Sequence, residues 1–380
     1  MELRNIRIAV FNAGTATLKI AVLAVNGTDV IEELRENHAW PGDAPAPEAA
    51  ARALDSFAGR LDAIGHRVVH GGMEFRLPAR IDDDVETKLE KLVPLAPLHN
   101  ARSLALIRLV RHAAANVPSF AVFDTAFHAD RSKESMSYAL PSGLVEKHAI
   151  RRYGFHGIAH QSMVESLAQA SACAVSEVTA VTLQLGSGCS ACAVREGRSV
   201  EVSMGYTPLD GLVMATRSGS IDPTVVLTLL RYGHGPDEIE RDLTRNSGLL
   251  ALAGKSDMRE IVADAATVGS QAEFALQLFV RRIVMTVGAY FTLLDGQGAL
   301  VFGGGIGTHS AQVRKRVALG LSAWNVIVND DLNETSSPGF ISASQSRQVY
   351  VARTDEEAVI ARQISAAMRP TPPETRNRMA

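Results

Sequence analysis

The chain has 380 residues, enough for two domains that each have a hydrophobic core. Hydrophobic residues make up 46% of the chain and charged residues 21%, and the net charge is −3, so neither a disordered chain nor a nucleic-acid-binding protein is indicated. No apolar run approaches the roughly 20 residues of a membrane span, and the N-terminus turns polar too early for a secretory signal, so we expect a cytoplasmic protein.

The first predicted element is a strand, a glycine turn and a second strand over residues 6–25, IRIAVFNAGTATLKIAVLAV. Strand-like and helical segments follow, among them DAIGHRVVHGG, ARSLALIRLVRHAAA and SFAVFDTAFH, and their mixture predicts an α/β architecture. Residues 178–203 then repeat the strand–turn–strand plan with VTAVTLQLGSGCSACAVREGRSVEVS. The sequence therefore indicates a coarse internal duplication in which one hairpin opens each half.

The second hairpin contains a CxxC spacing, Cys189 to Cys192, that also occurs in redox pairs and zinc sites. Here the two cysteines lie in a strand-like run, and positions i and i+3 of a strand point to opposite faces. No second CxxC is present to complete a zinc site. We interpret the cysteines as strand residues and the chain, with three cysteines in all, as a protein of a reducing compartment.

A third glycine loop follows a buried strand late in the chain, in GALVFGGGIGTHSAQVRKRVALGL. A strand, a glycine loop and a helix in this order let backbone N–H groups approach a phosphate closely. The loop is neither a Walker loop nor a dinucleotide fingerprint, because no GK[ST] follows and the glycine spacing differs. A tight turn alone would explain one such loop, but three of them indicate a nucleotide site.

Ten motifs occur in one order along nearly the whole chain: FNAGTATLK, GHRVVHGG, APLHN, AVFDTAFH, RRYGFHGIAH, SMGYTPLDGL, TRSGSIDP, SGLLALAGKSDMRE, VFGGGIG and RTDEEAVIAR. In these motifs the chain resembles the acetate kinases, from about residue 6 to residue 366. The resemblance implies two similar actin-like (ribonuclease H-like) domains around a nucleotide cleft. The expected domains are residues 1–124 with 358–380, and residues 125–357, which carry most nucleotide contacts.

The resemblance also implies an activity and its partners. Members of this family transfer a phosphoryl group reversibly from MgATP to acetate, giving acetyl phosphate and ADP, and Mn²⁺ is a possible substitute for Mg²⁺. They are typically homodimers, and neither nucleic acid nor a membrane is an expected partner. Acetate is ionised at neutral pH and needs no general base, so the reaction calls for positioning and for cancelling charge.

Four residues match the family's catalytic positions. Arg67 and Arg217 would clamp the acetate carboxylate and the transferring phosphoryl group, because a guanidinium fork suits planar oxyanions; a structural ion pair is the alternative. His156 would donate a hydrogen bond to the phosphoryl oxygens in the transition state. Asp124 would orient a Mg²⁺-bound water or a guanidinium group, and the alternative is an aspartate that caps a turn.

Two further histidines and a small apolar pocket also match the family. His160 follows His156 by four residues, but HGIAH lacks the glutamate of HExxH, so a structural histidine is favoured over a zinc ligand. His99 resembles a secondary substrate or phosphate contact, with a core histidine as the alternative. The acetate methyl group would lie among Val69, Leu98, Phe155 and Pro208, although simple core packing explains the same residues.

The metal side of the site follows from RTDEEA and from the first hairpin. Thr354 and Glu357 have the spacing of a capping box, which leaves Glu356 as the Mg²⁺ ligand that the family implies. Asn12 would be the other metal-side contact, and Lys19 a neighbour of the phosphates.

The nucleotide residues come from the two later loops and from KSDMRE. Those implied by the resemblance are Gly186, Ser187 and Gly188 for the phosphates, and Asp257, Met258, Arg259, Gly305, Ile306 and Gly307 for adenosine. Asp257 and Arg259 have a second explanation, a charge pair at the start of a helix.

The chain departs from the family pattern on the nucleotide side. Ser187 replaces an asparagine, Thr308 and His309 replace Glu-Asn, Ser220 replaces an aspartate and Ala215 replaces a glycine. These changes leave three alternatives to acetate kinase open: a kinase of propionate or butyrate, a catalytically silent nucleotide-binding sensor or scaffold, and an enzyme that uses a pyrophosphate-type donor. The last is disfavoured by the intact GGGIG.

Overall fold

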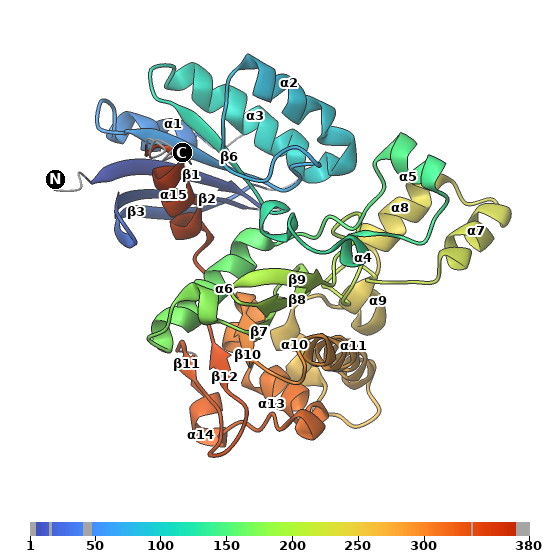
Figure 1. The fold of residues 1–380 in the computed structure, drawn as a ribbon. Helices are drawn as coiled ribbons and strands as arrows, with labels where there is room; N and C mark the ends of the chain where they lie inside the picture. Colours follow the sequence, from blue (N-terminus) through green and yellow to red (C-terminus); the bar gives the residue numbers. More distant parts are fainter. Residues whose placement is uncertain (1–4, 15–16, 41–47, 336, 370–380) are drawn as a thin grey trace, which may run out of the picture. The chain divides into compact units, whose positions relative to one another are not determined.

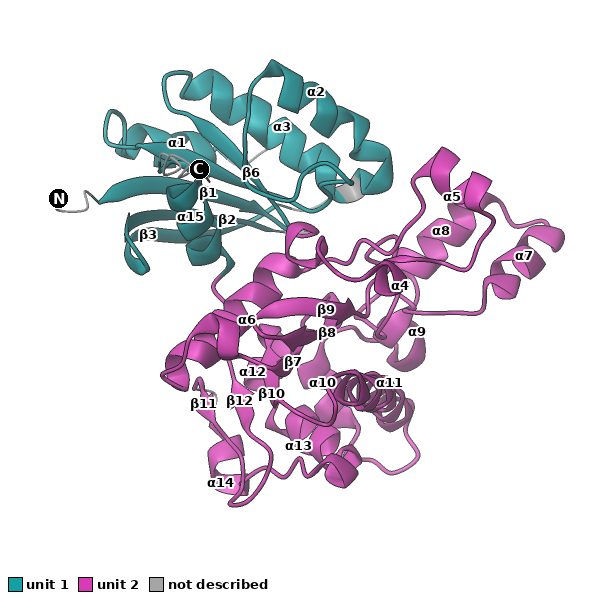
Figure 2. Cartoon of the chain, in the orientation of Figure 1, with its two compact units in different colours: residues 1–123, 356–380 teal, residues 124–355 magenta. Residues whose placement is uncertain are grey.

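The computed structural model describes residues 5–14, 17–40, 48–335 and 337–369 (Figure 1). The chain divides into two compact units, residues 1–123 with 356–380, and residues 124–355 (Figure 2). Each unit is an α/β structure built on its own sheet, as the sequence predicted.

The first unit is built on a sheet with the strand order β3-β2-β1-β4-β6-β5. Strands β1 (Ile6–Ala13), β2 (Thr17–Asn26) and β3 (Asp29–Ala39) form an antiparallel meander, β4 (Ala63–Val68) and β6 (Ser119–Phe123) run parallel to β1, and β5 (Ala79–Arg80) returns antiparallel to β6. Its helices are α1 (Ala49–Ser56), α2 (Asp83–Lys91), α3 (Pro97–Ala113) and α15 (Glu356–Ala367).

Helices cover both faces of this sheet. On one face, Phe11 of β1 packs into a core cluster with residues of α1 and α3. On the other face lies α15, because a Cβ atom at Gly65 of β4 would meet Ile360 and Ile364 of this helix as well as Val10 of β1. Because neighbouring residues of a strand point to opposite faces, β1 must be apolar on both sides, which explains its nearly continuous hydrophobic run.

The second unit repeats the plan with the strand order β9-β8-β7-β10-β12-β11. Its strands are β7 (Ala180–Leu185), β8 (Cys189–Arg195), β9 (Arg198–Val202), β10 (Ala299–Gly303), β11 (Gly339–Phe340) and β12 (Val349–Val351). Its helices are α4 (Lys133–Met136), α5 (Ser142–His148), α6 (Gly157–Ala170), α7 (Pro223–Arg231), α8 (Pro236–Arg245), α9 (Gly248–Ala253), α10 (Met258–Asp264), α11 (Gln271–Leu293), α12 (Gly304–His309), α13 (Ala311–Gly320) and α14 (Asp330–Asn333).

The two sheets share one topology. In each, an antiparallel hairpin comes first, two further strands run parallel to its first strand, and a two-residue strand closes the edge antiparallel. Both hairpins predicted from the sequence are thus confirmed, and so is the duplication. The strand predicted before GGGIG is confirmed as β10, and the amphipathic helix predicted after it is α13. The glycines between them do not form the predicted loop, because α12 begins at Gly304 directly after the strand.

The cysteines of the CxxC spacing lie in β8, as predicted. Cys189 and Cys192 are free thiols, and burial raises the pKa of each to about 12. Cys189 Sγ donates to the carbonyl of Gly186, and Cys192 packs in the core cluster beside α6. Neither thiol is prepared for redox chemistry, which requires a low pKa and exposure.

Helix α11 is the one helix among the described residues that is long and apolar enough to cross a membrane by length and composition. It packs along α9, α10 and α13 within the second unit, and Ile283, Val287 and Phe291 on its inner face are buried. These contacts are those of a core helix.

Candidate active site

Asn12 is the centre of a polar cluster at the end of the first hairpin strand. Its side-chain nitrogen donates to Glu356 Oε2 at 2.8 Å and to Glu357 Oε1 at 2.6 Å, and its oxygen accepts from Arg67 Nη1 at 3.2 Å. Asn12 ends β1, Arg67 lies on the neighbouring parallel strand β4, and the glutamates begin α15. The fold thus brings together three of the predicted site residues of the first unit and one more glutamate.

Glu357 does not form the capping box predicted from the sequence. Its carboxylate accepts from Asn12 and, at 2.6 Å, from Arg35 Nη1 of β3, while the Thr354 hydroxyl accepts from the backbone N–H of Gly304. Helix α15 begins only at Glu356, so the predicted spacing does not match the helix start. A nearly buried carboxylate is stabilised more by an amide and a guanidinium than by one backbone N–H.

Glu356 presents a carboxylate that could hold a metal ion with few other ligands. It accepts from Asn12, and Lys19 Nζ lies 4.0 Å from its Oε2. Among the described residues there is no group of three or more His, Cys, Asp or Glu side chains that could hold a metal. Mg²⁺ is usually bound by one or two carboxylates, waters and substrate phosphates, so a single partly exposed carboxylate fits Mg²⁺ better than it fits zinc.

In the second unit, the turn between β7 and β8 brings Arg217 and His156 together. The turn is closed by a hydrogen bond from the N–H of Gly186 to the carbonyl of Gly188. A Cβ atom at Gly188 would lie 2.6 Å from Arg217 Nη2 and 3.2 Å from His156 Cε1. Only glycine leaves room here, so the turn backbone, a guanidinium and an imidazole share one small space. Ser187, at the tip, is exposed.

Arg217 is held by its own half of the chain. Its Nη1 donates to the carbonyl of Pro208 at 2.7 Å, and burial lowers its pKa from the ordinary value. Arginine keeps its charge in proteins even so. The guanidinium is therefore a fixed and poorly hydrated cation beside the glycine turn, which is the environment in which a cation attracts phosphate oxygens most strongly.

His156 has a backbone conformation that is uncommon for a residue other than glycine, with φ of 59° directly before α6. Its Nδ1 lies 2.9 Å from Ser190 Oγ. His160, one turn further along α6, is buried with Nδ1 2.7 Å from Thr182 Oγ1 and Nε2 2.8 Å from Ser190 Oγ. Both nitrogens of His160 therefore have hydroxyl neighbours and are not arranged for zinc.

Asp124 is fully buried directly after β6. Its carbonyl accepts from the N–H of Gly157 at 2.9 Å, and a side chain on Gly157 would collide with that carbonyl. This contact fixes the backbone of Asp124 to the start of α6, next to His156.

The predicted substrate pocket is only partly described. Val69 and Phe155 are buried and Pro208 is half-buried, whereas the side chain of Leu98 lies outside the described part of the structure. His99 is half-buried in the first turn of α3.

The GGGIG segment lies beside the second hairpin. Gly304 has φ of 73°, and a Cβ atom there would lie 2.5 Å from the carbonyl of Leu185, so only glycine allows this approach. Gly304 begins α12 directly after β10, so Gly305, Ile306 and Gly307 lie in the first turns of the helix.

Arg314 supports this segment and was missed by the sequence analysis. It is buried and donates to the carbonyls of Gly307 at 3.0 Å and Thr308 at 2.7 Å, and also to Asn333. The only signal in the sequence is a charged residue within the amphipathic run AQVRKRVALG, which also describes an exposed arginine.

Asp257 and Arg259 form the charge pair that was the alternative explanation for them. Asp257 caps α10 by accepting from the N–H of Arg259 at 2.9 Å, and hydrogen bonds from Arg259 lower its pKa to about 2. The side chain of Arg259 is 90% exposed and Met258 is buried.

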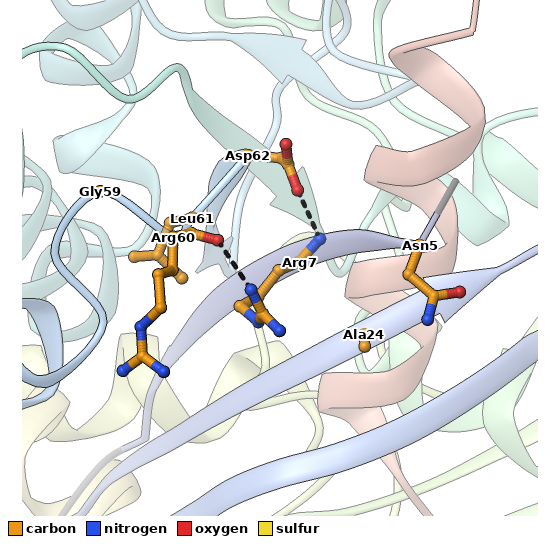
Figure 3. Close-up of a pocket in the computed structure, with 7 residues that line it drawn as sticks. All are labelled: Asn5, Arg7, Ala24, Gly59, Arg60, Leu61 and Asp62. Atoms are coloured by element: carbon orange, nitrogen blue, oxygen red, sulfur yellow. Dashed lines mark hydrogen bonds between the residues drawn. The ribbon is translucent and has the colours of Figure 1, made fainter.

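Surface hollows of the first unit are lined by residues other than those around Asn12. One is lined by Asn5, Arg7, Ala24, Gly59, Arg60, Leu61 and Asp62, at the opposite end of β1 from Asn12 (Figure 3). Both of its cations already have partners. Arg7 Nε donates to Glu33 at 2.7 Å and Arg7 Nη1 donates to the carbonyl of Arg60, while Arg60 Nη2 donates to the carbonyl of Ser56. Because these guanidinium groups already have partners, the hollow is a poorer candidate for phosphoryl transfer than the residues around Asn12 and Gly188.

Comparison with known protein sequences points to a single family. The model of the acetokinase family matches residues 48–362. An acetate kinase of Sulfurimonas denitrificans is 42% identical over 81% of this chain and 79% of its own length, and one of Streptomyces avermitilis is 40% identical over 93% and 88%.

Solved structures of acetate and propionate kinases are similar to this chain over nearly its whole length. A propionate kinase of Francisella tularensis is 33% identical, with a TM-score of 0.84 over 94% of this chain and 98% of its own. The Porphyromonas gingivalis acetate kinase is 30% identical, with a TM-score of 0.84 over 96% and 100%.

Proposed function

The chain belongs to the acetokinase family, and on this basis we propose that it catalyses reversible phosphoryl transfer from ATP to acetate, giving acetyl phosphate and ADP. The observation that carries the proposal is the arrangement at Gly188, where a guanidinium and an imidazole adjoin a glycine turn. Phosphoryl transfer depends on such positioned cations and donors far more than on acid–base groups.

Acetate supplies its own nucleophile, because its carboxylate is ionised at neutral pH. Arg67 and Arg217 are proposed to neutralise the acetate and the phosphoryl oxygens, so that two anions can approach in line. His156 donates a hydrogen bond to the phosphoryl oxygens as charge develops on them. Asp124 is proposed to orient a Mg²⁺-bound water or a guanidinium group and to remove no proton.

Mg²⁺ is the metal that the residues fit, with Mn²⁺ as a possible substitute. Glu356 would hold it through the carboxylate, with Asn12 beside it and Lys19 near the phosphates. When bound, such an ion neutralises charge on the nucleotide phosphates. The nucleotide itself is proposed to bind at Gly186–Gly188 and at Gly305–Gly307, with Met258 near the adenosine.

The choice of acid is proposed to be acetate first and propionate second. A hydrophobic pocket distinguishes one methylene by only about 1–3 kcal/mol, which corresponds to about 10- to 200-fold. Val69, Phe155 and Pro208, with Leu98, are the proposed lining. Propionate should therefore react more slowly without being excluded.

Hydroxylamine trapping of acyl phosphate tests the proposal. The protein is incubated with ATP, Mg²⁺ and acetate, propionate or butyrate, and pyrophosphate replaces ATP in a parallel series. We expect the most hydroxamate from ATP and acetate. No product with any acid and either donor would reject the kinase activity and favour a silent nucleotide-binding protein.

We also propose a cytoplasmic homodimer. The three free thiols support a reducing compartment. The described helix α7 has no buried residue although its sequence is PTVVLTLLR, and Val225, Leu227 and Tyr232 are exposed. Such an apolar face favours a protein partner. Light scattering should give twice the chain mass, and a monomeric mass at micromolar concentration would contradict the dimer.

A further inference from the structure

A continuous line of hydrogen-bonding groups runs through the second unit from Thr182 to His156. Thr182 Oγ1 lies 2.7 Å from His160 Nδ1, and His160 Nε2 lies 2.8 Å from Ser190 Oγ. The same Ser190 oxygen lies 2.9 Å from His156 Nδ1. Thr182, His160 and Ser190 are 0% exposed, so the order of donors and acceptors is set within the line itself.

The number of hydrogens that each group in the line can donate limits the order of donors and acceptors. Burial lowers the pKa of His160 to about 3, so its ring is neutral at neutral pH and carries one N–H. Ser190 has one hydroxyl proton, and among the described residues its oxygen contacts only the two ring nitrogens. The buried proton therefore has an acceptor only if Ser190 donates to one ring and accepts from the other. Two directions of donation along the line then give every proton an acceptor. In one of them His156 Nδ1 accepts a hydrogen bond from Ser190, and in the other Nδ1 carries a hydrogen and donates it to Ser190.

In the first direction the Thr182 hydroxyl donates to His160 Nδ1, His160 Nε2–H donates to Ser190, and Ser190 donates to His156 Nδ1. In the reverse direction Thr182 must give its proton to the carbonyl of Cys192, which is 3.5 Å away. At 3.5 Å this contact is at the outer limit of a hydrogen bond, so the reverse direction leaves the buried Thr182 hydroxyl proton almost without an acceptor. The first direction gives the same proton the His160 Nδ1 acceptor at 2.7 Å and is therefore favoured.

We propose that Thr182, His160 and Ser190 are positioning residues that hold His156 in the tautomer with its hydrogen on Nε2. The role rests on the proposed function, in which His156 donates to the phosphoryl oxygens. A Cβ atom at Gly188 would lie 3.3 Å from His156 Nε2, so this nitrogen adjoins the phosphate turn. In this tautomer the phosphoryl oxygens meet an N–H, whereas the other neutral tautomer would present a lone pair to them.

Nitrogen-15 NMR of the histidine rings tests the tautomer directly, because protonated and unprotonated ring nitrogens have well-separated resonances. The whole protein, labelled at histidine, is measured at pH 7.5, and His156→Gln assigns the ring. We expect a protonated Nε2 and an unprotonated Nδ1 in His156. A protonated Nδ1 in His156 would overturn the proposal. The measurement needs no turnover, so it is decided separately from the acetate kinase activity.

A matched pair at Thr182, which is two hydrogen-bonding groups away from His156, tests the line. Thr182→Val keeps the shape without the hydroxyl, and Thr182→Ser keeps the hydroxyl. We expect Thr182→Val to shift the His156 ring resonances and to lower kcat about fivefold with both KM values unchanged, since about 1 kcal/mol is lost with a neutral hydrogen bond. Thr182→Ser should stay near wild type.

Ring resonances of His156 that are the same in Thr182→Val as in the wild type would contradict the proposal, as would equal shifts in both variants. If Thr182→Val does not fold, Ser190→Ala replaces it with the same expected signature, namely altered His156 resonances and a lower kcat without a change in KM.

Discussion

The two glycine hairpins have the same topology and different chemistry. Beside the first, Asn12 connects two glutamates to Arg67, with Arg35 and Lys19 nearby, so the cluster is almost entirely charged. Beside the second, the line from Thr182 to His156 consists of hydroxyls and imidazoles, and Arg217 is the cation at its end.

We propose that the duplicated fold divides one reaction between its two hairpins. Carboxylates held by an amide suit a metal ion, because their charge stays in place for it. Hydroxyls and imidazoles beside a fixed guanidinium suit a phosphoryl group, because they stabilise its negative charge by hydrogen bonds and add no carboxylate that would repel it. We therefore assign the metal side to the first hairpin and the phosphoryl side to the second, and the following predictions test this division.

Arg217→Ala should have the largest effect. Removing the guanidinium from the phosphoryl side should lower kcat at least about 10³-fold with the melting temperature retained, because the cation acts mainly in the transition state. Arg217→Lys serves as the matched control and should recover part of the rate, since an ammonium supplies charge without the fork. Turnover near the wild-type rate in Arg217→Ala would contradict the assignment.

Glu357→Ala should weaken the first hairpin itself. The variant removes a carboxylate that Asn12 and Arg35 both contact, although Asn12 keeps its contact with Glu356 and Arg35 keeps its contact with Glu32. Because Arg35 is partly exposed, we expect a loss of about 1–2 kcal/mol in the free energy of unfolding. Urea titration measures it. Glu32→Ala is the control, because Glu32 pairs with Arg35 at the surface and should contribute less than about 0.5 kcal/mol. Equal losses in the two variants would show that Glu357 has no special role.

The sequence predicted the parts of this site that local patterns encode. Alternation and glycine turns defined both hairpins, and the apolar run before GGGIG defined its strand, although the glycines after it form a helix instead of the predicted loop. The contacts of Glu357 were not predictable, because its partners Asn12 and Arg35 lie more than 300 residues away along the chain while Thr354 offered a local explanation. Arg314 was missed for the same reason, since its burial depends on Asn333 and on the end of α12.

Two buried histidines extend the comparison to the dependence of stability on pH. His160 has hydroxyl neighbours at both ring nitrogens, whereas in the described part of the chain neither nitrogen of His66 has a hydrogen-bond partner. Burial lowers the pKa of His66 to about 3. Below about pH 6.5 the unfolded chain therefore binds a proton at His66 that the folded chain does not bind. The contribution of His66 leaves the free energy of unfolding unchanged above this pH and lowers it as the pH drops toward 3.

His66→Phe should remove this contribution. Relative to wild type, the variant should gain about 2 kcal/mol in the free energy of unfolding between pH 7 and pH 5, from about 1.4 kcal/mol for each pH unit below 6.5. Urea titration at the two pH values measures the gain, and His112→Gln, at an exposed histidine of α3, should show none. An unchanged difference between the two pH values would mean that His66 takes up its proton in the folded state.

The most direct test of the division between the hairpins is the dependence of the rate on free Mg²⁺ in two variants, one from each side. Glu356→Gln should raise the Mg²⁺ concentration for half-maximal rate about tenfold or more, because it removes the proposed ligand. Arg217→Lys should lower kcat and leave that concentration within about twofold of wild type. The same shift in both variants, or no shift in Glu356→Gln, would contradict the division.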